Sequence, residues 1–60
     1  MPKIRKAEAV AIAIDMQQAR QPPTARGPEI ASELRRHGLV NERGNWSAEA
    51  AEALYNWLHG

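Results

Sequence analysis

The sequence predicts a small all-α protein: a three-helix bundle that is helix-turn-helix-like, with a long second connector. Three observations lead to this fold class. Apolar residues recur at helical spacing in three stretches, and segments rich in proline and glycine separate those stretches. The chain has 60 residues and no cysteine, so a compact helical core or a partner must stabilise it. We therefore expect one helical domain over residues 1–60.

The first helix is expected over about residues 3 to 21. Residues at helical spacing form its expected inward stripe: Ile4, Ala7, Val10, Ala11 and Ile14. Ile12 and Met16 lie on a different side, where they are either exposed or in contact with another chain. Pro22 and Pro23 end the helix, because proline lacks the N–H that a helix interior needs.

The second helix is expected over about residues 28 to 37. Proline suits the first helical position, so Pro28 is the favoured start and Gly27 the cap, with Thr24 as a competing cap. Ile30 and Leu34, four residues apart, form the expected buried stripe.

A specific connector, "HGLVNERGNWS", follows the second helix. Gly38 is suited to the left-handed conformation that stops a helix, and Leu39 would then fold back onto Leu34. Trp46 is expected to re-enter the apolar interior, and Ser47 to cap the next helix. The connector is therefore predicted to stop one helix, pack on the core and start another.

The third helix is expected over about residues 48 to 59. Its expected inward residues share helical spacing: Ala51, Leu54, Tyr55 and Leu58. Trp57 lies toward another side of this helix, where it either covers the edge of the core or is exposed.

The residues offer no catalytic constellation, so we expect no enzymatic activity. The serines are Ser32 and Ser47, and the cap explains Ser47. His37 and His59 are far apart in sequence and lack ligand partners nearby, so we expect neither a metal nor a cofactor. No apolar run approaches the length of a membrane helix and no cleavage site follows the N-terminal segment. We expect a cytoplasmic protein without a membrane or small-molecule partner.

Charge is unevenly distributed, although the net charge is only +1. Every lysine and arginine lies within the first 43 residues, and the later part contains Glu49 and Glu52 but no cation. These basic residues are either solvated or bind phosphates. Because the third helix lacks cations, we expect phosphate contacts from the second helix and the following turn, with help from the N-terminus. The candidate nucleic-acid-binding residues are Arg26, Arg35, Arg36, Arg43, Lys3, Arg5 and Lys6.

The segment "PEIASELRRHGLVNERGNWSAEAAEALYNWL", residues 28–58, resembles the C-terminal DNA-binding region of serine recombinases of the resolvase and invertase type. The matching positions are Ile30-Ala31, Leu34, Gly38-Leu39, Arg43-Gly44 and Trp46-Ser47. The resemblance implies a helical module that binds double-stranded DNA and comes from a mobile element. It does not imply recombination, because it covers the DNA-binding region and not the catalytic domain with its nucleophilic serine. Arg35 and Asn41 depart from the asparagine and threonine usual in the family.

A second interpretation is a protein-interaction or dimerisation module that binds no nucleic acid. The near-neutral charge and the acidic third helix favour it. Its expected contact residues, Ile12, Met16 and Trp57, all lie away from the predicted core stripes and form a face for a homodimer or another protein.

Overall fold

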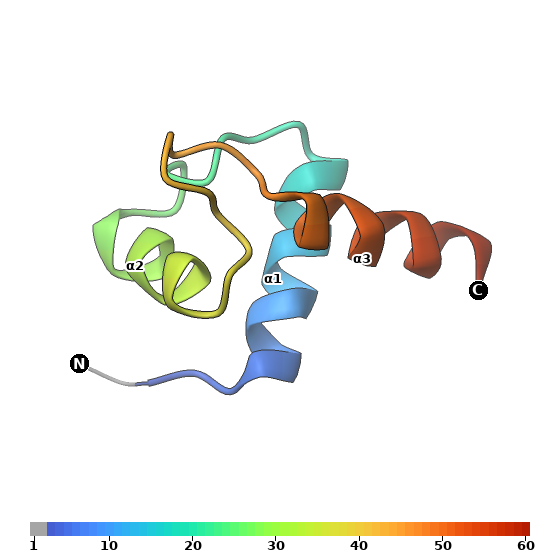
Figure 1. Ribbon diagram of the computed structural model, residues 1–60, viewed down its shortest axis with the longest axis horizontal. Coiled ribbons are helices and arrows are strands. Elements are labelled where there is room, and N and C mark those ends of the chain that lie inside the picture. The colour runs from blue at the N-terminus through green and yellow to red at the C-terminus, as the bar shows by residue number, and fades with distance from the viewer. Residues whose placement is uncertain (1–2) are drawn as a thin grey trace.

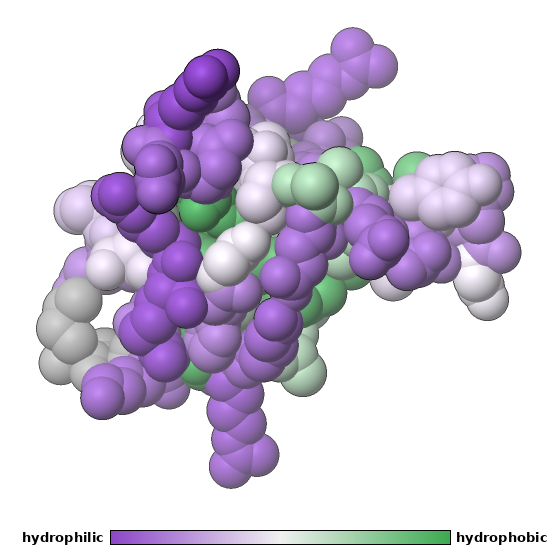
Figure 2. All heavy atoms as spheres, in the orientation of Figure 1, coloured by the Kyte–Doolittle hydropathy of each residue, from purple (hydrophilic) through white to green (hydrophobic). Residues whose placement is uncertain are grey.

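The computed structural model describes residues 3–60, which form three α-helices: α1 (Lys6–Gln18), α2 (Pro28–Arg36) and α3 (Ala48–His59). Helix α1 lies in the centre, and α2 and α3 pack against it (Figure 1). Within the described residues, α2 and α3 make no direct helix–helix contact. In the same view, hydrophilic side chains cover the α2 side and apolar residues show between the helices (Figure 2). The predicted all-α three-helix fold is confirmed.

Helix α1 is shorter at both ends than the predicted 3–21. It begins at Lys6, because the N-cap residue Arg5 has an extended backbone conformation. It ends at Gln18 because Arg20 adopts a left-handed conformation with φ 57°. The Gln21 N–H then donates to the Met16 carbonyl at 2.9 Å, closing a Schellman stop. The helix thus ends before the two prolines that were predicted to break it.

Both ends of α2 follow the predicted signals. The helix begins at Pro28 with Gly27 as the N-cap, and it ends at Arg36, one residue earlier than expected. Gly38 has φ 79°, and the Leu39 N–H donates to the Leu34 carbonyl at 2.9 Å. This is the predicted Schellman stop, and it turns Leu39 back toward the core.

Replacing Gly38 by alanine should destabilise the protein by about 1–2 kcal/mol, the cost of left-handed backbone for a residue with a Cβ. The added Cβ would lie 3.4 Å from Glu49 Oε1, an ordinary contact, so backbone strain causes the loss. Urea denaturation followed by circular dichroism measures it. Gly38→Asn is the matched control and should cost less, since asparagine tolerates this conformation better. Equal stability of Gly38→Ala and the parent would contradict the left-handed stop.

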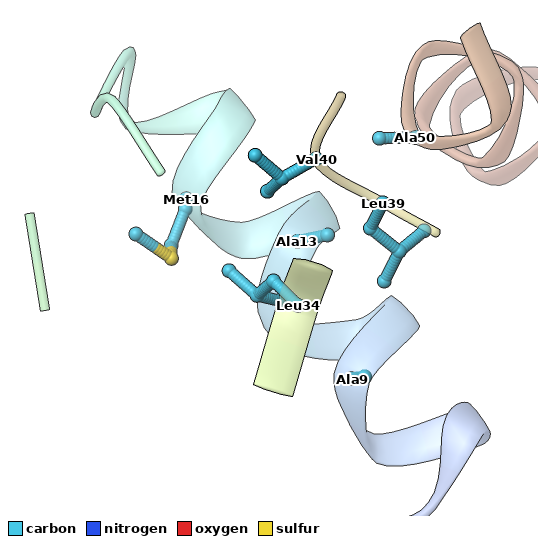
Figure 3. Packing of buried hydrophobic residues seen from close by; sticks show 7 residues of the cluster. All are labelled: Ala9, Ala13, Met16, Leu34, Leu39, Val40 and Ala50. Carbon is cyan, nitrogen blue, oxygen red and sulfur yellow. The ribbon is translucent and has the colours of Figure 1, made fainter. Parts of the chain in front are cut away.

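The core is a small cluster contributed by all three helices and the connector (Figure 3). Met16, Leu34 and Leu39 are its largest fully buried side chains. Leu39 and Val40 come from the segment after α2 and pack with α1 and with Ala50 of α3. This segment therefore takes the place of a direct α2–α3 contact.

The predicted inward face of α1 is partly wrong. Met16 is fully buried and Ile12 packs against the core, although both were predicted to lie off it. Ala7 and Ala11, expected to face inward, are exposed. Helix α1 carries apolar residues on most of its circumference, so helical spacing alone could not identify the face that packs.

Helix α3 has the predicted bounds but a different inward face. The Ser47 hydroxyl caps it by accepting from the Ala50 N–H at 3.3 Å. Ala50 is buried, whereas Tyr55 and Leu58 are 61% and 57% exposed. Ala51 is also exposed, and Leu54 is half-buried. The C-terminal half of α3 extends away from α1, so little of the chain is left to cover the predicted stripe (Figure 1).

Trp46 packs against the core and anchors the connector to it. It is half-buried, forms an isolated antiparallel bridge with Val40, and its indole N–H donates to the Gln21 carbonyl at 3.1 Å. The Ser47 hydroxyl donates to the Gly38 carbonyl at 2.7 Å. The connector is thereby fastened both to the end of α1 and to the end of α2.

Candidate nucleic-acid interface

The N-terminal residues 3–5 are held against the last turn of α2 through the main chain of Ile4. The Ile4 N–H donates to Glu33 Oε1 at 3.1 Å, and the Arg36 guanidinium donates to the Ile4 carbonyl at 3.1 Å. His37 Nε2 lies 2.9 Å from the same carbonyl oxygen. Since Lys3 and Arg5 flank Ile4, this docking brings two further cations beside Arg36.

Arg36 and Glu33 form the ion pair that organises this docking, with Arg36 donating to Glu33 Oε1 at 2.8 Å. The hydrogen bond from Arg36, followed by the one from the Ile4 N–H, holds the pKa of Glu33 below its ordinary value. The same pair raises the pKa of Arg36. Glu33 therefore remains an acceptor for the N-terminal segment in more acidic solution than an ordinary glutamate would.

Arg35 and Arg43 are exposed, and neither has a carboxylate within salt-bridge distance among the described residues. Arg35 shares a shallow groove with Val40 and Gly44. Arg43 precedes Gly44 in a turn where Asn41 Oδ1 accepts from the Arg43 N–H at 2.9 Å. The turn thus fixes the Arg43 backbone near the side of α2 that carries Arg35.

Arg35 and Arg36 lie in the last turn of α2, the N-terminal segment with Lys3 and Arg5 docks on Arg36, and Arg43 lies in the turn that follows α2. We call this set the α2 ridge: Lys3, Arg5, Arg36, Arg35 and Arg43. Glu49 and Glu52 lie on α3, but Glu49 pairs with Lys6 and its carboxylate lies close to Gly38, just after α2. Arg35 and Arg36, in the last turn, also complement the negative end of the α2 dipole.

Two predicted contact residues lie outside this arrangement. Lys6 pairs with Glu49 and joins the start of α1 to α3. Arg26 pairs with Asp15 and holds the α1–α2 connector against α1. Each pair involves exposed side chains, so each adds little to stability, but it places a carboxylate beside the cation. We therefore leave Lys6 and Arg26 out of the α2 ridge; Arg36 also has a carboxylate partner, Glu33, but it stays in the set because it holds the N-terminal segment on α2.

The residues predicted for the protein-interaction alternative do not form one surface. Met16 is fully buried and so is not available for contact, whereas Ile12 is half-buried and packs against the core with part of its side chain. Trp57 is 59% exposed and lines a groove with residues of α1: Ala7, Val10, Ala11, Ile14, Asp15 and Gln18. Sequence reasoning missed Tyr55 and Leu58 as exposed residues, because their helical spacing is the usual signal of a buried stripe.

Comparisons with protein-family models, with curated proteins and with solved structures give no match to this chain. The resemblance to serine recombinases therefore stays a prediction. Across residues 3–60, no helix combines the length and apolarity that crossing a bilayer requires.

Proposed function

We propose that this chain is a small cytoplasmic DNA-binding module, related to the DNA-binding region of mobile-element recombinases, that contacts duplex phosphates through the α2 ridge. One observation carries the proposal: the docking of residues 3–5 on α2 brings the segment with Lys3 and Arg5 to the helix end that carries Arg35 and Arg36. Affinity for DNA is dominated by such phosphate contacts.

The proposal assigns different roles within the α2 ridge. Arg35 and Arg43 have no carboxylate within salt-bridge distance in residues 3–60, so they are the primary phosphate contacts. Lys3 and Arg5 assist from the docked N-terminal segment. Arg36 holds that segment in place by donating to the Ile4 carbonyl and to Glu33, and this positions Lys3 and Arg5. Helix α3 carries Glu49 in its first turn, a charge that phosphates repel, so it does not enter the groove.

The double substitution Arg35→Ala with Arg43→Ala should weaken duplex binding and reduce the slope of log affinity against log salt by about 2, one unit for each lost phosphate contact. Fluorescence anisotropy with a short duplex, at salt from about 50 to 200 mM, measures both quantities.

Lys6→Ala with Arg26→Ala is the matched control, because it removes the same charge from two paired positions. This control should leave the slope unchanged. An equal loss in both double variants would mean that only net charge matters. If the chain showed no measurable binding to DNA at low salt, the proposal that it is a DNA-binding module would be refuted.

A second candidate function is protein interaction, and the exposure of Tyr55, Trp57 and Leu58 on α3 favours it. These side chains lie on a different helix from the α2 ridge, so the two functions do not compete for the same surface.

A further inference from the structure

Arg20 departs from the usual way in which a helix stops. It occupies the left-handed position of the Schellman stop of α1, with φ 57°, and its N–H donates to the Gln17 carbonyl at 3.0 Å. Glycine usually fills this position, as Gly38 does after α2, because a residue with a Cβ is strained there. Among residues 3–60, Arg20 is the only non-glycine residue with a positive φ. A long charged side chain at such a position indicates a role that the helix stop does not require.

The Arg20 side chain is available to a ligand. It is exposed, and no carboxylate of the described residues lies within salt-bridge distance of it. Arg26, in the same connector, instead pairs with Asp15. Arg20 therefore shares with Arg35 and Arg43 the property that makes those two residues the primary phosphate contacts.

Arg20 borders a groove between the α1–α2 connector and the segment that precedes α3. These two segments run side by side beyond the end of α1 (Figure 1), and the indole N–H of Trp46 joins them by donating to the Gln21 carbonyl. Pro22 and Trp46 give the groove an apolar wall, and the amide side chains of Gln21 and Asn45 also line it. We call this hollow the Arg20 groove.

The Arg20 groove adjoins the groove beside Arg35. Pro23 lines both grooves, and the consecutive residues Gly44 and Asn45 line one each. None of the described residues that line either groove is acidic. A polyanion that contacts Arg35 therefore meets no carboxylate in either groove as it continues across Pro23 to Arg20.

We propose that the Arg20 groove binds the sugar-phosphate backbone of the same DNA duplex that the α2 ridge contacts. The Arg20 guanidinium donates to a phosphate, and Pro22 and Trp46 pack against the adjoining deoxyribose. Charge complementarity selects this occupant, because the adjoining grooves offer two cations and no acidic lining, and duplex DNA carries one negative charge per roughly 1.7 Å of its length. The inference rests on the proposed DNA-binding function and extends its contact surface from α2 to the end of α1.

Arg20→Gly tests the proposal, because it separates the helix stop from the phosphate contact. Glycine suits the left-handed position, so the midpoint of thermal unfolding should stay the same or rise by up to about 5 °C. Duplex binding should weaken about fivefold to tenfold at about 0.1 M salt, and the slope of log affinity against log salt should fall by about 1. Fluorescence anisotropy measures binding, and circular dichroism at 222 nm measures the midpoint. If Arg20 served only the dipole of α1, the substitution would leave the slope unchanged.

Two matched controls accompany this variant. Arg20→Lys keeps the positive charge, so it should keep the salt slope. Arg26→Ala removes the same charge from a position that is paired with Asp15, and it should leave the slope unchanged. Adding Arg20→Gly to the variant with Arg35→Ala and Arg43→Ala should bring the total reduction of the slope to about 3.

The two tryptophans report where the duplex binds. Trp46 lines the Arg20 groove, whereas Trp57 lies on α3 and lines a different groove. In a titration with duplex DNA followed by nuclear magnetic resonance, the indole N–H signal of Trp46 should shift and that of Trp57 should not. A shift of the Trp57 signal without a shift of the Trp46 signal overturns the inferred location.

The salt titrations distinguish this inference from the proposed function. If Arg20→Gly leaves the slope unchanged while Arg35→Ala with Arg43→Ala lowers it, the Arg20 groove is overturned and the α2 ridge stands. Equal reductions of the slope by Arg20→Gly and Arg26→Ala also overturn the inference, since net charge alone would explain them. A parent chain that does not bind DNA at low salt overturns both proposals. Polyglutamate that displaces the duplex as well as unlabelled duplex does overturns DNA as the occupant.

Discussion

Replacing Leu39 by alanine should lower the free energy of unfolding by about 2–5 kcal/mol, the usual cost of truncating a buried leucine. Leu39 is fully buried between α1, α2 and α3, so the truncation leaves a cavity in the core. A chain of 60 residues has a total stability of roughly 3–9 kcal/mol, so the loss is a large fraction of it. Urea denaturation followed by circular dichroism measures the free energy of unfolding, and we expect the transition to move to a much lower urea concentration.

Leu58→Ala is the matched control for this experiment. It deletes the same atoms from a side chain that is 57% exposed, so at concentrations where the chain is monomeric it should change stability by less than about 0.5 kcal/mol. Similar losses from Leu39→Ala and Leu58→Ala would mean that Leu39 does not lie in the core.

Trp46→Ala should have the second-largest effect, a loss of about 2–3 kcal/mol. Deleting a fully buried tryptophan costs about 3–5 kcal/mol, and Trp46 is half-buried, so its cost lies below that range. The substitution also removes the hydrogen bond from the indole N–H to the Gln21 carbonyl, which ties the connector to the end of α1. The midpoint of thermal unfolding, followed at 222 nm, measures the effect.

Trp46→Phe separates the two contributions. It keeps an aromatic ring over the core but cannot donate to Gln21, so it should recover more than half of the loss. If Trp46→Ala left the unfolding midpoint unchanged, the indole would be dispensable and the connector would be held by Leu39 and Val40 alone.

Signals confined to a few neighbouring residues were sufficient to predict where elements begin and end. Pro28 and Gly27 start α2, Gly38 stops it, and Ser47 starts α3, because each acts through its own backbone or side chain. The end of α1 was misplaced because Arg20 adopts the left-handed conformation that glycine usually supplies. Nothing in the local sequence distinguishes Arg20 from a helical arginine.

Faces and long-range contacts were harder to predict. Spacing identified an apolar stripe on α3, but it could not tell whether the stripe would meet the core or solvent. The docking of Ile4 on Glu33 and Arg36 joins residues about thirty positions apart. No sequence pattern within either segment predicts this contact. The candidate site was therefore predicted as a list of cations, and their arrangement around α2 came from the tertiary structure.

The lack of contact between α2 and α3 has a consequence for how the two proposed surfaces work together. Leu39 and Val40 of the connector, together with the central helix α1, join the two helices instead. Any influence of phosphate binding on a partner bound at α3 would therefore pass through the packing of these shared residues.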